Sequence, residues 1–132
     1  MRYMLDTNIC IYLIKNQPET VLENLRTKVQ YGLAISAITL AELAKGVESS
    51  TYPEKNTVAL NQFLTIVNIL PFDDEAAMEY GKICASLRRK GTPIGPLDTL
   101  IAAHAKSQGL VIVTNNTREF ERVEDLELEN WI

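Results

Sequence analysis

The feature that most constrains the fold is an uninterrupted run of large, mostly β-branched residues from Leu110 to Val113, which ends at Thr114. β-Branched side chains favour extended backbone, and a strand with one solvated face would alternate apolar with polar residues. A short run without polar residues is therefore typical of a strand that is buried on both faces. Such strands occur in parallel sheets with helices on both sides, so this segment predicts an α/β domain.

Shorter strand-like runs and helical patterns alternate along the rest of the chain. We predict further strands at Tyr3–Leu5, at Leu33–Ile35, at Val67–Leu70 and near 126–128. We predict helices over residues 8–14, from Pro18 to about Val29, around Leu40–Val47, from Pro53 through Leu64, from the acidic residues 73–75 to Gly91, and from Asp98 to Gly109. Val58, Leu60, Phe63 and Leu64 are the core candidates of the helix that Pro53 opens. Strands separated by helices predict one three-layer α/β/α domain over residues 1–132, with a central, mostly parallel sheet.

The net charge of −4 is distributed unevenly along the 132 residues. Residues 121–132 hold five acids and one base, so residues 1–120 carry twelve of each sign. If the protein binds RNA, it does so through a local basic patch and a metal rather than through a global positive field. No segment reaches the ~18 apolar residues of a membrane span. Asp6 stands where the apolar region of a signal peptide would run, so we expect a cytoplasmic protein without membrane contact.

Acidic side chains follow the predicted strands at the points where those strands end. Asp6 follows the first strand, Glu42 lies about a turn into the helix behind the second, and Asp98 precedes the fourth strand. Glu119 follows that strand, just after Asn116. Because ligands of open α/β sheets bind beyond the carboxyl ends of the strands, we expect these side chains to gather at one edge. Clustered carboxylates repel each other, and Mg²⁺ or Mn²⁺ would offset that repulsion with the oxygen ligands these ions prefer.

Taken singly, each acid also has a structural interpretation that spacing alone leaves open. Asp6 and Asp98 are helix-capping residue types placed before predicted helices. Glu42 and Glu119 are equally compatible with solvated positions on a helix or loop. Thr7, Asn8, Ser36 and Thr114 are either caps or hydrogen-bond partners that orient the acids.

Four short motifs in order resemble those of a known family. The segments Met4–Asn8, Ser36–Leu43, Gly95–Ala105 and Val113–Phe120 are similar to the four successive motifs of PIN domains. The resemblance extends over essentially the whole chain, including Glu129–Trp131, and the nearest likeness is the VapC branch of toxins. Any one motif would be weak evidence, whereas four in order are specific.

This resemblance implies a PIN-like fold and an Mg²⁺-dependent endoribonuclease, with Mn²⁺ as a plausible substitute. It implies inhibition by a cognate VapB-like antitoxin, a homodimer, and transfer RNA as the substrate, with the anticodon loop of the initiator species as the expected site. By position, Asp6 and Asp98 would be the principal metal ligands and Glu42 the third acid. Many PIN domains have Asp where this chain has Asn116, so either Glu119 supplies the missing charge or the site works with one ion. We also expect the antitoxin to place a basic side chain near Asp6 and Asp98.

Other functions fit the sequence less well. Phosphatases of the haloacid-dehalogenase type need a second Asp two residues after the first, and Asn8 occupies that position. A receiver domain needs an acid pair and a late Lys, and no phosphate-binding GxxxxGK[ST] loop is present. The only histidine, His104, is six residues past Asp98, about 240° around a helix, so we expect it to face away from the acids. A catalytically weak or inactive PIN-fold module that binds RNA or a partner remains the alternative, and Asn116 is the residue that favours it.

Overall fold

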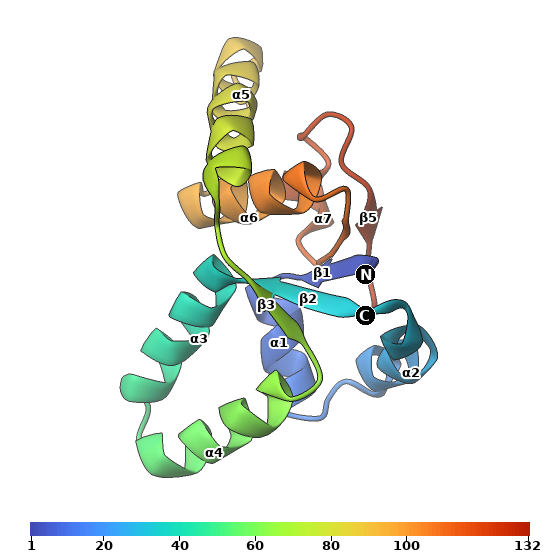
Figure 1. Cartoon of the computed structure of the whole chain (residues 1–132), viewed down its shortest axis with the longest axis vertical. Coiled ribbons are helices and arrows are strands. Elements are labelled where there is room, and N and C mark those ends of the chain that lie inside the picture. Colours follow the sequence, from blue (N-terminus) through green and yellow to red (C-terminus); the bar gives the residue numbers. More distant parts are fainter.

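A computed structural model describes all 132 residues and contains one five-stranded sheet (Figure 1). Its strands are β1 (Tyr3–Leu5), β2 (Leu33–Ser36), β3 (Asn68–Leu70), β4 (Val111–Val113) and β5 (Leu128–Glu129). They lie in the order β3-β2-β1-β4-β5, and every neighbouring pair is parallel. The predicted parallel sheet is therefore confirmed, and all of its carboxyl ends lie at one edge.

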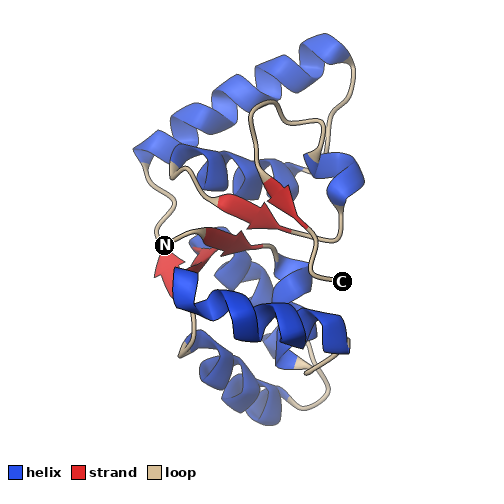
Figure 2. Cartoon of the chain, turned by 90° about the vertical axis from the view of Figure 1, so that its right-hand side faces the viewer, coloured by secondary structure: helices blue, strands red, loops and turns tan.

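Helices cover both faces of this sheet (Figure 2). In chain order they are α1 (Thr7–Ile14), α2 (Glu19–Lys28), the short 3₁₀ helix η1 (Val29–Tyr31), α3 (Ala37–Glu48), α4 (Pro53–Leu64), α5 (Asp74–Lys90), α6 (Pro96–Ser107) and α7 (Thr117–Phe120). Helices α5 and α6 lie on one side of the sheet, and α1 to α4 lie on the other (Figure 1). This arrangement is the predicted three-layer α/β/α fold.

Successive side chains of each strand pack alternately into two separate hydrophobic cores. In β1, Tyr3 and Leu5 join the core of α1 to α4, whereas Met4 joins the core of α5 and α6. The same alternation holds in β4, where Ile112 joins Met4 and its neighbours Val111 and Val113 join the opposite core. Successive side chains of a strand point to opposite faces, so a strand between two helix layers must be apolar throughout.

Several details differ from the sequence prediction. Helix α6 begins at Pro96 rather than at Asp98, because proline is well suited to the first helical turn, where its missing N–H is not needed. Strand β5 pairs through Leu128 and Glu129, about two residues later than expected. Val58 was wrongly expected in the core, since it faces solvent with 57% of its surface exposed.

The helices that lead away from the carboxyl edge begin at polar caps. The Asp6 carboxylate accepts a hydrogen bond from the Ile9 N–H at 3.0 Å, and Ser36 Oγ accepts one from the Ile38 N–H at 3.1 Å. Each cap satisfies an N–H that the first helical turn leaves free. The caps thus anchor α1 and α3 to the ends of β1 and β2. No helix in the chain has the length and apolar character that crossing a membrane would require.

Candidate metal centre

The candidate site lies where the order of the sheet reverses. The chain passes from β1 to its neighbour β2 on one side, whereas β4 pairs with β1 on the other. At such a switch point the loops leaving the two strands diverge and open a crevice at the carboxyl edge. Asp6 follows β1, and Thr114 to Asn116 follow β4, so both segments border that crevice.

Asp6 is the most firmly held acid of the group. It is 3% exposed, and its carboxylate accepts a hydrogen bond from the Ile9 N–H at 3.0 Å. Burial raises the pKa of Asp6, the nearby Thr114 hydroxyl and the Ile9 N–H lower it, and the charge of Glu42 raises it further. Asp6 can be both a helix cap and a metal ligand. The cap of α1 uses one carboxylate oxygen, and the remaining carboxylate lone pairs stay available for an ion.

Glu42 approaches from α3 and is held by Thr7. Thr7 Oγ1 donates a hydrogen bond to Glu42 Oε1 at 2.6 Å. This bond connects the first turn of α1 to the second turn of α3. Thr7, which directly follows Asp6, thereby holds Glu42 close to Asp6. We name Asp6, Thr7 and Glu42 the Asp6 corner.

Asp98, Asn116 and Glu119 form a second group, which we name the Asp98 corner. Asn116 Nδ2 donates to Asp98 Oδ2 at 3.3 Å and to Glu119 Oε2 at 3.0 Å. The amide is therefore a bridge between two carboxylates, which can only accept. The backbone N–H of Asn116 in turn donates to Thr114 Oγ1 at 2.9 Å. The Thr114 hydroxyl also lowers the pKa of Asp6, so Thr114 acts on both corners.

The two corners contain four acids and no base. None of the four ion pairs in the molecule involves Asp6, Glu42, Asp98 or Glu119. The pKa of Asp98 rises to about 7, first because of burial and then because of Glu119, with smaller contributions from Asp6 and Glu42. The acids are thus close enough to influence one another, and their mutual repulsion is not offset by any side chain.

The side chains do not yet converge on a single point. No three acids, histidines or cysteines lie close enough together to hold a metal ion as they stand. The structure pairs Asp6 with Glu42 and Asp98 with Glu119 at the same edge of the sheet, with the charges of Asp6 and Glu42 still felt by Asp98. Sequence patterns missed the bridging role of Asn116, and the one signal for it was an amide standing between two acids in sequence order.

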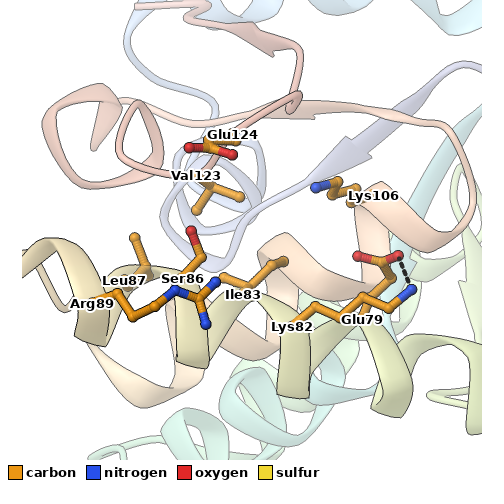
Figure 3. Close-up of a pocket in the computed structure, with 9 residues that line it drawn as sticks. All are labelled: Glu79, Lys82, Ile83, Ser86, Leu87, Arg89, Lys106, Val123 and Glu124. Carbon is orange, nitrogen blue, oxygen red and sulfur yellow. Dashed lines mark ion pairs between the residues drawn. The ribbon is translucent and has the colours of Figure 1, made fainter.

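Two pockets near these elements differ in character. A largely apolar groove of about 360 Å³ opens beside Glu42 between α1, α3 and α4, and its walls include Ile11, Ile14 and Val47. A second pocket, of about 200 Å³, lies between α5, α6 and the segment at Val123 and Glu124 (Figure 3). Figure 3 shows charged side chains around it, including the pair of Lys82 with Glu79 at 3.7 Å. None of the predicted site residues lines this second pocket.

The fold and its acidic edge define a known class of domain. Residues 3–126 match the family model described as PIN domain, and the chain belongs to that family. Ribonucleases of the family depend on a metal.

Within the family, the chain is similar to VapC proteins over its whole length. It is 49% identical to the tRNA(fMet)-specific endonuclease VapC of Shigella flexneri, with 99% of this chain and 98% of that protein covered. It is 46% identical to ribonuclease VapC2 of Haemophilus influenzae, with 100% and 99% covered. The crystal structure of VapBC2 from Rickettsia felis, bound to a DNA fragment from its promoter, contains a chain with a TM-score of 0.95 and 42% identity at full coverage of both. The predicted family and branch are thereby confirmed.

Proposed function

We propose that this protein is the toxin of a type II toxin–antitoxin pair and acts as a metal-dependent endoribonuclease on initiator tRNA. The observation that carries the proposal is the group of four carboxylates at the carboxyl edge, for which the chain supplies no basic partner. The substrate follows from the relatives, of which those from Shigella flexneri and Salmonella typhimurium are named for tRNA(fMet) and are each 49% identical to this chain.

The residues present fit a divalent cation, and we propose Mg²⁺ with Mn²⁺ as a substitute. All candidate donors are carboxylate or amide oxygens, which hard cations prefer. Asp6, Asp98 and Glu42 would hold the ion, and binding would draw the Asp98 corner toward the Asp6 corner. When bound, such an ion polarises a phosphoryl oxygen and lowers the pKa of a coordinated water.

The chain's own residues divide the remaining work. Thr7 donates to Glu42, and the Ile9 N–H donates to Asp6, so the acids of the Asp6 corner are oriented before any ligand arrives. The Asn116 amide donates to both Asp98 and Glu119 and so helps to hold the two acids side by side. Glu119 would supply the fourth acid that Asn116 does not. His104 is bonded inside the fold to Ser36 and is not available as an acid or a base.

A VapB-like antitoxin would occupy the apolar groove beside Glu42. The solved relatives include VapBC complexes that cover this entire chain, so a partner of that type is the occupant to which we commit. The groove ends at the Asp6 corner because Glu42 forms part of its wall. A segment seated there would therefore carry a basic side chain to the carboxylates, where it would compete with the cation. The homodimer that the family resemblance implies stays a prediction, which light scattering of the purified toxin would check.

Cleavage of defined RNAs tests the proposed function. Purified protein with Mg²⁺ should cut initiator tRNA within the anticodon loop and leave an elongator tRNA intact, as mapped by primer extension. EDTA and the Asp6→Ala variant should each abolish this cleavage. The antitoxin encoded beside this gene should abolish it as well. Cleavage that survives both EDTA and Asp6→Ala would contradict a metal-dependent nuclease, and retention of tRNA without cleavage would favour the non-catalytic module.

A further inference from the structure

The only histidine makes a buried contact with the second sequence motif. His104 Nδ1 lies 2.7 Å from Ser36 Oγ, and both residues are fully buried. Ser36 Oγ also accepts a bond from the Ile38 N–H at the start of α3. The hydroxyl keeps its hydrogen and one lone pair for Nδ1, and the imidazole tautomer decides which of the two donates. One serine therefore caps α3 and is bonded to α6 at the same time.

The strand pattern explains why these two residues meet. Ala34 faces the core of α5 and α6, and Ile35 faces the opposite core. The next residue, Ser36, therefore points toward α6. On the other side of His104, the ring of Phe72 packs edge-to-face with a centroid distance of 5.3 Å. The imidazole is fixed between Phe72 and Ser36.

The second ring nitrogen of His104, Nε2, indicates that this residue has a role beyond packing. His104 Nε2 is buried and has no hydrogen-bond partner. A buried unpaired polar group costs about 1–3 kcal/mol, and a phenylalanine would pack against Phe72 without that cost. What a phenylalanine could not provide is the hydrogen bond to Ser36.

The contact lies between the helices that carry Glu42 and Asp98. Glu42 is six residues after Ser36, and Asp98 is six residues before His104. Six helical residues span about 9 Å, so a rotation of ~5° at the contact would move an acid by about 0.8 Å. Ligand constellations need to be held within about 0.5 Å of their working geometry.

We propose that the Ser36–His104 hydrogen bond sets the angle between α3 and α6 and so positions Glu42 and Asp98 for the cation. Ser36 and His104 are positioning residues in this scheme, since neither is among the residues that would hold the ion. This inference rests on the proposed metal-dependent function and adds to it two residues outside the acidic cluster.

Two substitutions at His104 separate positioning from packing. His104→Phe keeps the aromatic contact and removes the hydrogen bond, whereas His104→Asn keeps a polar atom near the position of Nδ1 and removes ring volume. We expect His104→Phe to raise the Mg²⁺ dissociation constant about tenfold, the usual loss when a residue that orients a metal ligand is removed, with a melting temperature at or above that of the wild type. We expect His104→Asn to melt several degrees lower because of the cavity, yet to bind Mg²⁺ within about twofold of the wild type.

Thr39→Val is the matched control. Thr39 is buried on the first turn of α3, and its hydroxyl has no partner, so the change removes a buried polar atom near Ser36 without touching the contact. Isothermal titration with Mg²⁺ should give wild-type affinity for Thr39→Val. If affinity followed melting temperature across the three variants, the histidine would be a packing residue only and the proposal would be overturned.

Spectra of the metal-free protein distinguish failure of this inference from failure of the proposed function. The backbone amide signals of residues 41–43 and 97–99 should shift in His104→Phe and remain near wild type in His104→Asn. Unchanged signals in His104→Phe would overturn the positioning role, whatever the protein binds. A wild-type protein that takes up no Mg²⁺ would overturn the metal-dependent function and, with it, the purpose assigned to this contact.

Discussion

The two corners of the site are built on different principles. In the Asp6 corner, each acid has a donor of its own, because Asp6 accepts from the Ile9 N–H and Glu42 accepts from the Thr7 hydroxyl. In the Asp98 corner, two acids share the single amide of Asn116. The first corner is therefore part of the folded framework, whereas the second is held together weakly against its own repulsion.

This difference indicates how an ion would complete the site. Hydrogen bonds from the Ile9 N–H and the Thr7 hydroxyl orient the Asp6 corner without any ligand. The repulsion in the Asp98 corner is relieved only by protonation or by a cation. We infer that the Asp6 corner determines where the ion binds and that the Asp98 corner closes on it.

The largest expected effect comes from neutralising either principal acid. Asp6→Asn and Asp98→Asn should each lower kcat for tRNA cleavage on the order of 10³-fold, since a bound ion contributes several kcal/mol and each 1.36 kcal/mol is tenfold. Their effects on the metal-free protein should have opposite signs. Asp98→Asn removes repulsion and should raise the melting temperature at pH 7, whereas Asp6→Asn loses the cap of α1 and should lower it.

Single-turnover kinetics and thermal melts of both variants would measure these effects. Glu121→Gln is the control, because Glu121 is an exposed acid just past α7. Equal responses of the two variants in the metal-free melts would break the proposed contrast between the corners.

A smaller effect is expected from restoring the acid that many relatives of this fold carry. Asn116→Asp removes the two bonds to Asp98 and Glu119 and adds a fifth charge. Leaving such groups unpaired costs about 1–3 kcal/mol, so the metal-free protein should melt several degrees lower. Saturating Mg²⁺ should reverse that loss, because the ion would then meet a stronger negative field.

Asn115→Asp provides a matched control for this comparison. Asn115 is adjacent in the chain, and its amide donates to the hydroxyl of Tyr12 at 3.3 Å rather than to an acid. Its replacement adds the same charge without removing the bridge. If Mg²⁺ rescued both variants equally, the bridge would have no special role in the Asp98 corner.

The sheet could be predicted from the sequence because its strands lie between two helix layers. Buried strands of this kind leave an unbroken apolar signal, and Leu110–Val113 and Tyr3–Leu5 both show it. The edge strand β5 is only two residues long, and its position depends on pairing with β4, which no local pattern encodes. The buried places of Leu60 and Phe63 followed from helical spacing, whereas Val58 shows that spacing alone does not define the width of a buried face.

The sequence indicated which acids lie at the carboxyl edge of the sheet but not the contacts between them, and their role toward a metal stays a prediction. Strand ends and motif order indicated Asp6, Glu42 and Asp98 as neighbours, because parallel strands bring their carboxyl ends together. The amide bridge at Asn116 and the buried contact of His104 with Ser36 depend on how α6 and the loop after β4 pack. Such contacts are between residues 18 and 68 positions apart, and no periodicity in the sequence encodes them.

The smallest expected effect is a dependence of stability on pH that arises from Asp98. Its pKa is about 7 in the metal-free fold and near 3.8 in an unfolded chain, so the folded state binds the proton more tightly. The resulting stabilisation is complete below about pH 4 and is lost as the pH rises through 7. Asp98 is partly exposed, so solvent reduces the size of this effect.

Other acids titrate over the same range, and the informative quantity is therefore the melting temperature of wild type minus that of Asp98→Asn. This difference should become more negative between pH 5 and pH 8 without metal, and it should stop doing so in saturating Mg²⁺, which replaces the proton. A difference that stays constant with pH would mean that the Asp98 corner is as well satisfied as the Asp6 corner, and that the ion has no repulsion there to relieve.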